Sequence, residues 1–407
     1  MQSRHVRVLG ITVSVATAVF TLACSSASKR SGFETDNSST EGASGGPGNG
    51  TGFGPSDPGK TGNGCTQTDP KADFDKDGFT IADGDCNDCD PNVNPGAMDV
   101  KGNGLDEDCS GKPDDEETEC DGSLPMAASD AMDGARAIGL CKQATDDKMW
   151  GVVEARWVKP DGSSLPAAGN IGYGVLTKLG INAAQAGATA LAISSGAARE
   201  PGDPAYKAVT VDKGFSHGTP PGYPKESPSC GGGAGFGFAS GAHDGAALQL
   251  KIRVPTNAKS FSYQQNFFTN EFPVYICDDY NDFFVTMMEP KPAGLPDGNI
   301  AFDQDGNPIS VNNSLLQVCS PQSAGGKSFS CPLGNSTLQG TGFENHAATG
   351  WLTTKAPVDT VRGKVITLTW AIWDQGDHAL DSTALIDDFQ WSAEPANGAV
   401  TAPTPPK

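Results

Sequence analysis

The sequence has little histidine, little positive charge and few aromatic residues. Only 5 of its 407 residues are histidine, and 7% are aromatic. Lys and Arg number 28 against 49 Asp and Glu, which gives a net charge of −21. A chain this acidic should repel nucleic acid and anionic lipid headgroups, so both are excluded as partners. The shortage of imidazole argues against a His-rich catalytic or transition-metal centre, whereas the carboxylates suit hard cations, above all Ca²⁺.

Features of common enzyme classes are also missing. The sequence contains no HExxH zinc motif, and its glycine-rich segment 231–237 lacks the Lys-Ser/Thr of a phosphate loop. Carboxylate pairs that could hydrolyse glycosides occur throughout so acidic a chain, so they give no positive signal. Four histidines outside the N-terminal segment are scattered along the chain and are interpreted as structural: His217, His243, His346 and His378. We therefore predict that the protein is not an enzyme.

The first residues form a targeting segment. Arg4 and Arg7 precede the uncharged apolar run Val8–Leu22, which is too short for a comfortable transmembrane helix. The run ends in Leu22-Ala23-Cys24, which resembles the lipobox of bacterial lipoproteins. The sequence thus predicts a signal peptide over residues 1–23 and a lipid-bearing Cys24, with an ordinary signal peptide and a leftover cysteine as the alternative. By resemblance to other lipoproteins, Ser25 after the cysteine suggests an outward-facing outer-membrane lipoprotein, for which the lipid would be the only membrane contact.

Residues 24–64 are predicted to be a disordered tether. They are rich in Ser, Gly, Asn and Thr, and their only large apolar residues are Phe33 and Phe53. Such a segment cannot bury enough apolar surface to offset its ordering entropy. The ten cysteines that follow form an even number in an exported chain, which predicts disulfide bonds.

An acidic module is predicted over residues 65–119. Between Cys65 and Asp121 the chain has 18 acidic and 4 basic residues, a net charge of −14. Such a run is often a solvated, disordered patch. Here, however, Asp73, Asp75 and Asp77 alternate before Gly78, as in the opening of an EF-hand calcium loop, where the seventh residue, Phe79, offers its carbonyl. Position twelve is a glycine rather than Glu, so Asp85 or Asp88 would complete the ligand sphere.

Two further segments of this module alternate oxygen side chains. One contains Asp88, Asp90 and Asn92, and the other contains Asn103, Asp106 and Asp108. Together the three segments could hold one to three hard cations. Disulfides would replace a hydrophobic core that is too small to fold such a module alone.

The module resembles a known family. Asp73–Gly78, Asp83–Asp88, Asn94–Ala97 and Asn103–Gly111 look like the MopE-like metal-binding motif of bacterial surface proteins, and they are similar to the calcium-binding type 3 repeats of thrombospondin. The resemblance implies a Cys86–Cys109 disulfide, with Cys65–Cys89 as the natural second pair. The family name is associated with copper, but this segment lacks His and has one Met, so its ligands favour Ca²⁺ strongly over copper.

The remainder, residues 120–394, is predicted to be all-β after one short helix near 130–140. Apolar and polar residues alternate through short strands separated by Gly, Pro, Asn and Asp, which is typical of a sandwich or jelly roll. The expected strands are 247–254, 261–268, 281–288, 364–373 and 382–391, and residues 395–407 are expected to form a disordered tail. The fold class is therefore mainly β, preceded by the calcium-loop module and the tether.

A second resemblance covers residues 170–392. The runs 266–284, 308–313 and 370–389 look like the signature of the choice-of-anchor L domain of bacterial surface proteins. The resemblance implies a β-sandwich at the cell surface, and no catalytic activity is attached to the family. Acidic residues in these runs predict either a second metal site at one end of the sandwich or ordinary turn capping: Glu271, Asp282, Asp374, Asp377 and Asp381.

The other disulfides are predicted from proximity. Cys120 should pair with Cys141, and Cys319 with Cys331, which leaves Cys230 for Cys277. Two function classes then stay open. One is a calcium-binding envelope lipoprotein whose sandwich serves adhesion or matrix interaction with an unidentified protein or glycan; the other is a carbohydrate-binding or hydrolytic module. Aromatic rings exposed on one face would favour the second, and buried Trp351, Trp370, Trp373 and Trp391 the first.

Overall fold

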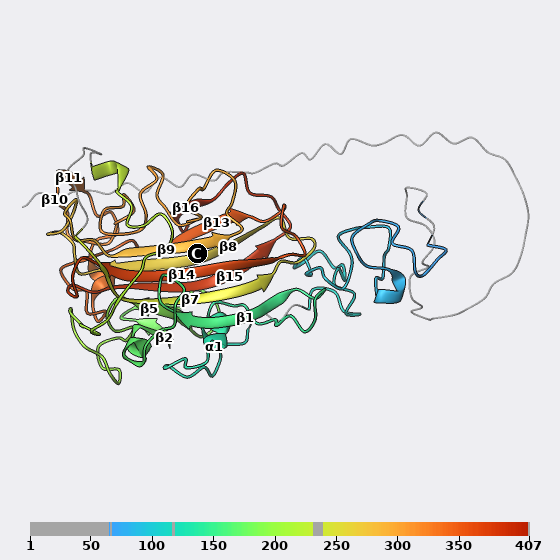
Figure 1. Cartoon of the computed structure of the whole chain (residues 1–407), viewed down its shortest axis with the longest axis horizontal. Helices are drawn as coiled ribbons and strands as arrows, with labels where there is room; N and C mark the ends of the chain where they lie inside the picture. The colour runs from blue at the N-terminus through green and yellow to red at the C-terminus, as the bar shows by residue number, and fades with distance from the viewer. Residues whose placement is uncertain (1–64, 66, 116–118, 231–238, 406–407) are drawn as a thin grey trace, which may run out of the picture. The chain divides into compact units, whose positions relative to one another are not determined.

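A computed structural model describes residues 65, 67–115, 119–230 and 239–405 (Figure 1). The predicted signal peptide, Cys24 and the predicted tether lie outside the described residues. Among the residues that are described, no helix is long and apolar enough to cross a membrane. The fold is mainly β, as the alternating sequence pattern predicts, and its strand pairs are antiparallel.

The first of two large sheets has five strands, in the order β1-β7-β14-β9, with β6 paired to β7. Side chains of β7 and β14 alternate between the two faces: Leu248, Leu250 and Trp370 join the main core, whereas Ala247 and Trp373 join a second cluster on the other face. This is the period-two pattern of a strand with two covered faces. The strand bounds are β1 Gly151–Val158, β6 Ser216–His217, β7 Ala242–Arg253, β9 Phe283–Glu289 and β14 Val365–Gln375.

The second large sheet has seven strands, in the order β16-β13-β8-β15-β5-β2, with β12 paired to β8. Its two longest strands lie side by side, with Ser382 opposite Thr269 and Ser392 opposite Ser260. A register shift between Asp387 and Gln390 marks an irregularity in this pairing. The bounds are β2 Tyr173–Leu176, β5 Ala190–Ser194, β8 Ser260–Thr269, β12 Ala347–Ala348, β13 Leu352–Pro357, β15 Ser382–Ser392 and β16 Val400–Pro403.

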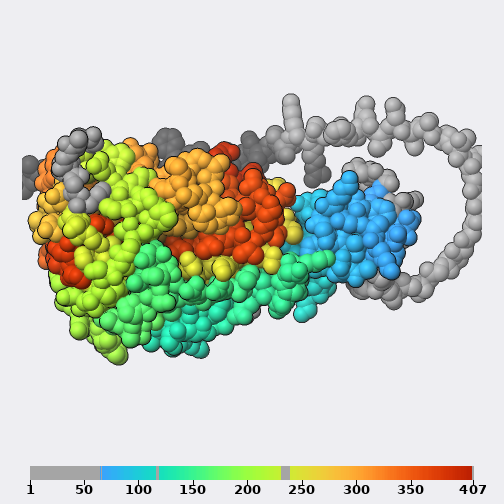
Figure 2. Space-filling model, viewed as in Figure 1, coloured from blue at the N-terminus to red at the C-terminus, as the bar shows by residue number. Residues whose placement is uncertain are grey.

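The two sheets enclose one main hydrophobic core. Leu250 and Trp370 of the first sheet and Phe261, Tyr263 and Ile386 of the second belong to it. The Tyr263 ring meets the Trp370 ring edge to face at 5.6 Å, which is a favoured aromatic geometry. The molecule is therefore a β-sandwich. In the space-filling view, residues 195–230 and the chain between β9 and β13 cover much of the visible face (Figure 2).

Short elements complete the fold. Asp130 caps α1 by accepting from the Met132 N–H (3.0 Å), and Gly139 follows the helix with a φ of +90° that favours glycine. This helix, α1 Ala131–Ala137, confirms the expected helix near 130–140. The remaining elements are the strands β3 Lys178–Leu179, β4 Asn182–Ala183, β10 Gln322–Ala324 and β11 Lys327–Phe329, and the 3₁₀ turns η1 Ile81–Asp83, η2 Ala167–Gly172, η3 Pro228–Cys230 and η4 Ser336–Leu338.

The predicted disordered tail over residues 395–407 is wrong for its central part. Residues 400–403 form β16, an edge strand that pairs with β13, with Thr354 opposite Thr401. The hydroxyls of these two threonines lie 2.8 Å apart in a hydrogen bond. The proline content of the tail masked this strand, but Pro403 stands at the end of an edge strand, where a missing N–H costs no ladder bond.

The acidic module does not form a compact unit of its own. The described residues from Cys65 onward belong to one unit, and the expected boundary at 119/120 falls within it. The Asn257 side chain accepts from the Met98 N–H (3.0 Å) and donates to the Met98 carbonyl (2.7 Å), and Met98 belongs to the main core. The turn between β7 and β8 thus holds the module through backbone bonds that sequence spacing cannot show.

All five predicted disulfides are present. They join Cys65 to Cys89, Cys86 to Cys109, Cys120 to Cys141, Cys230 to Cys277 and Cys319 to Cys331. Such bonds form and persist in oxidising compartments. The chain is therefore an exported or extracellular protein.

Candidate functional site

Five of the predicted calcium ligands converge in the acidic module. Asp73, Asp75 and Asp88 bring one oxygen each to within 4.8 Å of one another, and Asp75, Asp77 and Asp85 do the same. Asp75 belongs to both groups, so the five carboxylates form one continuous set, called here the first acidic cluster. A separation of 4.8 Å is about twice the Ca²⁺–oxygen distance of 2.3–2.6 Å. The cluster therefore has the dimensions of a calcium ligand sphere.

Backbone amides orient these carboxylates. Asp73 accepts from the N–H groups of Lys76 (2.6 Å) and Gly78 (3.1 Å), which folds the loop back upon itself. Gly78 has a φ of +99°, a conformation that favours glycine at the sixth loop position. The Phe79 N–H donates to Asp77 Oδ1 (2.8 Å). The predicted ligand role of the Phe79 carbonyl stays a prediction.

Three buried carboxylate oxygens in the first acidic cluster have no hydrogen-bond partner. They are Oδ2 of Asp75, Asp85 and Asp88. Asp85 is 3% exposed and Asp88 is fully buried, while the other oxygen of each accepts a backbone N–H. A buried acceptor without a donor is costly, and a buried charge without a partner costs more. Asp75 and Asp85 belong to one group of potential ligands and Asp75 and Asp88 to the other, so hard cations bound by these groups would satisfy such oxygens, and the residues present fit bound calcium.

The carboxyl pKa values reflect this crowding. Burial raises the pKa of Asp85 to about 7, and the nearby charges of Asp77, Asp75 and Asp88 add to the shift. Burial likewise raises the pKa of Asp75 to about 6, with Asp77, Asp88 and Asp73 contributing repulsion. The pKa of Asp77 is also raised, mainly by burial. In the absence of a cation, the cluster thus favours protons over full ionisation.

This crowding of carboxylates predicts that the stability of the fold depends on pH. Asp75 and Asp85 have folded-state pKa values of about 6 and 7, above the ordinary value of 3.8. A raised acid pKa contributes stability below its unfolded value, and this contribution is lost as the pH rises through the folded value. With EDTA present, we expect the melting temperature to fall between pH 5 and pH 8, and to fall less in the Asp75→Asn, Asp85→Asn variant. Thermal melts at each pH check this, and equal slopes for both proteins would contradict it.

Asn94 links the first acidic cluster to the sandwich. Its Nδ2 donates to Asp77 Oδ2 (2.7 Å), while its Oδ1 accepts from the Thr256 hydroxyl (2.8 Å). Thr256 follows β7, and its N–H donates to the Gly96 carbonyl (2.9 Å). Gly96 is required here, because a Cβ at this position would meet the Phe79 ring at 2.8 Å. Order in the calcium loop and order at this end of the sandwich are therefore connected by direct contacts.

Asp83 lies outside the first acidic cluster. Its carboxylate pairs with Lys148 at 3.3 Å and accepts from the Thr80 hydroxyl at 3.0 Å, and hydrogen bonds from these two groups lower its pKa. Lys148 also donates to the Gly78 carbonyl (3.3 Å). This lysine comes from the chain before β1, so it is a second link between the calcium loop and the sandwich.

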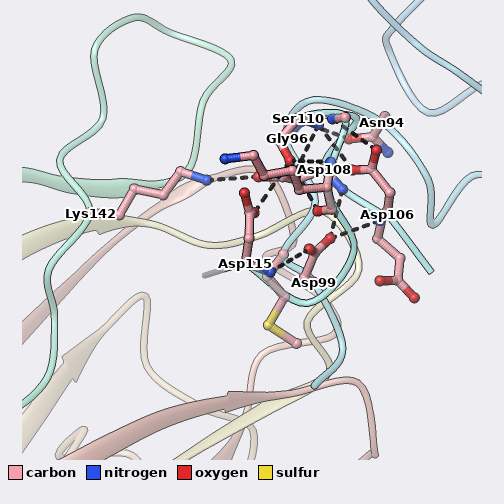
Figure 3. Close-up of polar contacts among 12 residues, drawn as sticks. Asn94, Gly96, Asp99, Asp106, Asp108, Ser110, Asp115 and Lys142 are labelled. Carbon is pink, nitrogen blue, oxygen red and sulfur yellow. Dashed lines mark hydrogen bonds and ion pairs between the residues drawn. The ribbon is translucent and has the colours of Figure 1, made fainter. Parts of the chain in front are cut away.

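A second acidic cluster contains Asp99, Asp108 and Asp115, whose ligand oxygens lie within 4.8 Å of one another. Figure 3 shows Lys142 reaching Asp108, at 3.3 Å. Asp99 accepts from the N–H groups of Asp108 (3.2 Å) and Asp115 (3.1 Å). Protein donors therefore already satisfy much of this cluster, which makes it a weaker cation site than the first. Sequence spacing predicted Asp108 but missed Asp99 and Asp115, because neither belongs to an alternating run.

Four other predicted ligands do not belong to either cluster. Asp90 accepts from the N–H and the side chain of Asn92 (3.1 and 2.9 Å), so these two residues form a local turn. Asp106 accepts from Ser110 and Gly111, and burial raises its pKa. Asn103 accepts from the Leu105 N–H (2.7 Å). These hydrogen bonds are of the kind with which Asp and Asn commonly shape turns, and the metal roles of the four residues stay predictions.

The predicted second metal site is only partly assembled. Glu271, Asp282 and Asp374 are buried at neighbouring strand ends, and burial together with mutual repulsion raises their pKa values, that of Asp374 to about 11. Asp377 and Asp381 add to this repulsion, and Asp381 also accepts from the Val211 N–H (3.1 Å). Four groups of three residues could hold an ion among the described residues, and none takes all its members from these five.

The sandwich displays no tryptophan platform for sugars. Trp370 and Trp373 are fully buried, and Trp351 and Trp391 are partly buried against the core. A cleft of about 440 Å³ is lined mostly by polar groups, including Ser229 and Lys327. Lys327 in this cleft is already held by the Ser229 hydroxyl (2.6 Å) and the Asn312 carbonyl (2.7 Å).

Three of the scattered histidines come together in the fold. His217 and His243 lie on β6 and β7, which pair, and the His378 ring is 4.1 Å from that of His243. Residues 214–218, Gly-Phe-Ser-His-Gly, match the GxSxG pattern of serine hydrolases, and Ser216 Oγ lies 3.0 Å from His243 Nδ1. That pattern requires a strand–turn–helix context. Here Ser216 lies in the two-residue strand β6, with no helix directly after it, so the match is fortuitous.

Comparison with family models, curated proteins and solved structures gave no match to this chain.

Proposed function

We propose that this exported protein binds Ca²⁺ through the first acidic cluster, and that the bound ion stabilises a β-sandwich used for adhesion or matrix interaction at the cell envelope. One observation supports the calcium part most directly. Five carboxylates form two groups that share Asp75, and three of their buried oxygens have no hydrogen-bond donor. No histidine, cysteine or methionine belongs to these groups, and an all-oxygen ligand set favours Ca²⁺ over copper.

Calcium should raise the melting temperature of the purified chain. Binding to the folded form alone adds about 2.7 kcal/mol at a hundredfold excess over Kd. Extracellular calcium modules bind at about 10⁻⁴–10⁻³ M, so the rise should need millimolar calcium. The Asp75→Asn, Asp77→Asn variant should lose it, whereas the matched Asp90→Asn, Asp106→Asn variant should keep it.

The melts are compared in calcium, magnesium, copper and EDTA. A transition unmoved by millimolar calcium, or raised by copper alone, would defeat the proposal. An equal calcium shift in both double variants would place the ion elsewhere in the chain.

The attachment of the protein to the outer membrane is also a proposal. A lipid on Cys24 would tether the folded part to the outer membrane, facing outward, which fits the disulfides of an exported chain. Cys24→Ala should release the protein from membranes in cell fractionation. Membrane association and gel mobility equal to those of the wild type would count against the anchor.

A sugar-binding or hydrolytic role is less well supported. Stacking on sugars needs exposed rings, and among the described residues of the sandwich Tyr280 is the only exposed aromatic residue and no tryptophan is exposed. The sandwich partner is therefore proposed to be a protein or matrix surface. A glycan array probed with the purified chain would reverse this preference if it gave specific binding.

A further inference from the structure

A group of side chains of the types that bind metal ions lies in the sandwich, apart from the acidic module. His378 Nδ1 is 2.6 Å from Asp244 Oδ2 and 3.2 Å from Asp212 Oδ1. The ligand atoms of these three residues all lie within 4.8 Å of one another. Asp244 lies in β7, Asp212 in the chain before β6, and His378 in the turn between β14 and β15. Three distant segments of the chain thus contribute to one point.

Asp244 is held firmly at this point. It is fully buried, and its carboxylate accepts from the N–H groups of Lys213 (3.1 Å) and Phe215 (3.2 Å). Its own N–H donates to the Phe215 carbonyl (3.0 Å). A buried carboxylate fixed by backbone donors is a preorganised ligand, because little entropy is lost when it binds a cation.

Both carboxylates approach the same ring nitrogen of His378. A ring nitrogen bears at most one proton, and one N–H can point directly at only one acceptor. A divalent cation between the three atoms would instead satisfy them together. With bonds of about 2.0–2.2 Å to nitrogen and oxygen, tetrahedral ligand atoms lie about 3.4 Å apart. The Asp212–His378 distance of 3.2 Å is close to that value, and the Asp244–His378 distance would need to lengthen.

The ligand types distinguish this group from the calcium cluster. An imidazole nitrogen suits Zn²⁺ and other late first-row metals, whereas Ca²⁺ prefers oxygen ligands alone. Asp212 is 65% exposed and His378 31% exposed, so an ion from solvent could reach them. We infer that Asp212, Asp244 and His378 form a binding site for a divalent transition metal such as Zn²⁺, with a position left for solvent.

The neighbouring Lys213 offsets only part of the negative charge of this group. The Lys213 ammonium donates to the carbonyls of Ser194 and Gly196 (both 3.1 Å). Among the nearby carboxylates, that of Asp244 acts on it most strongly, followed by those of Asp381, Asp282 and Asp374. The two carboxylates Asp212 and Asp244 outnumber this one ammonium, which favours uptake of a further cation.

Zinc competition with a chromophoric chelator tests the inference. The chain purified without its signal peptide is stripped of metal and then held in millimolar calcium, which occupies the acidic module. We expect one equivalent of zinc to be withdrawn from the chelator by the wild type. His378→Ala and Asp212→Asn should each lose that equivalent. His346→Ala is the matched control, because His346 bonds the Phe272 carbonyl instead and should keep it.

The calcium-induced melting shift shows that each variant is folded, and the exposed Asp212 can be changed without disturbing the core. Zinc bound equally by the His378→Ala and Asp212→Asn proteins would overturn the inference, since the ion would then lie elsewhere. A wild type that withdraws no zinc would overturn it too, and would leave His378 in an ion pair only.

Discussion

Replacing Cys86 and Cys109 with alanine should abolish the calcium-induced rise in melting temperature. This disulfide closes a separation of 23 residues, and loop-closure entropy gives it about 3 kcal/mol of stability. Cys86 lies between Asp85 and Asp88, which supply two of the three unpartnered oxygens. Without the bond, these carboxylates are no longer held near Asp75, so calcium binding should fail with the fold of the loop.

A disulfide in the sandwich provides the control. The Cys319–Cys331 bond closes a separation of 12 residues and should contribute a similar stability of about 3 kcal/mol. Its double alanine variant should melt earlier, yet keep the calcium shift. Urea unfolding with and without calcium measures the free energy lost with each disulfide and the free energy gained on calcium binding. Retention of the full calcium shift in the Cys86→Ala, Cys109→Ala protein would disprove the role assigned to this bond.

Trp370→Ala should lower the free energy of unfolding by about 3–5 kcal/mol, the usual range for truncating a buried large aromatic side chain. Trp370 is fully buried between the sheets and meets Tyr263 edge to face at 5.6 Å. Alanine would leave a cavity in the middle of the main core. Chemical denaturation measures the loss.

Trp351→Ala is the comparison, because Trp351 is only partly buried and packs against a smaller cluster. This change should lower the free energy of unfolding clearly less than Trp370→Ala does. If both changes cost the same, the main core would not lie between the sheets as described. If Trp351→Ala instead left stability intact and abolished binding to a glycan, the sugar-binding alternative would regain support.

Much of the β fold could be predicted from the sequence. Runs such as 247–254 and 364–373 alternate apolar and polar residues, and both lie in long strands. Local alternation reports strands because side chains point to opposite faces. It does not report which strands pair, and β16 was missed because its four residues gain their order from pairing with β13.

The candidate site was predictable where its ligands are close in sequence. The alternation of Asp73, Asp75 and Asp77 reflects one local loop, and these residues do converge. Asp90 and Asn92 show the same alternation but form a turn, since Asp and Asn also accept from the backbone two residues ahead. Spacing alone does not distinguish these outcomes; burial and unpartnered oxygens do.

The proximity of two histidines could not be predicted from the sequence. His243 and His378 are 135 residues apart, and nothing in their spacing associates them. Their rings meet only because β7 and β14 pair, with Asp374 opposite His243. Any group of side chains assembled from paired strands that are distant in sequence is hidden in this way.

Calcium titration calorimetry on the metal-stripped chain tests the central claim most directly. The account predicts saturable binding of at least one Ca²⁺ at up to millimolar Kd, lost in the Asp75→Asn, Asp85→Asn variant and kept in the Asp90→Asn, Asp106→Asn variant. Binding that is absent from the wild type, or unchanged by removal of Asp75 and Asp85, would contradict it.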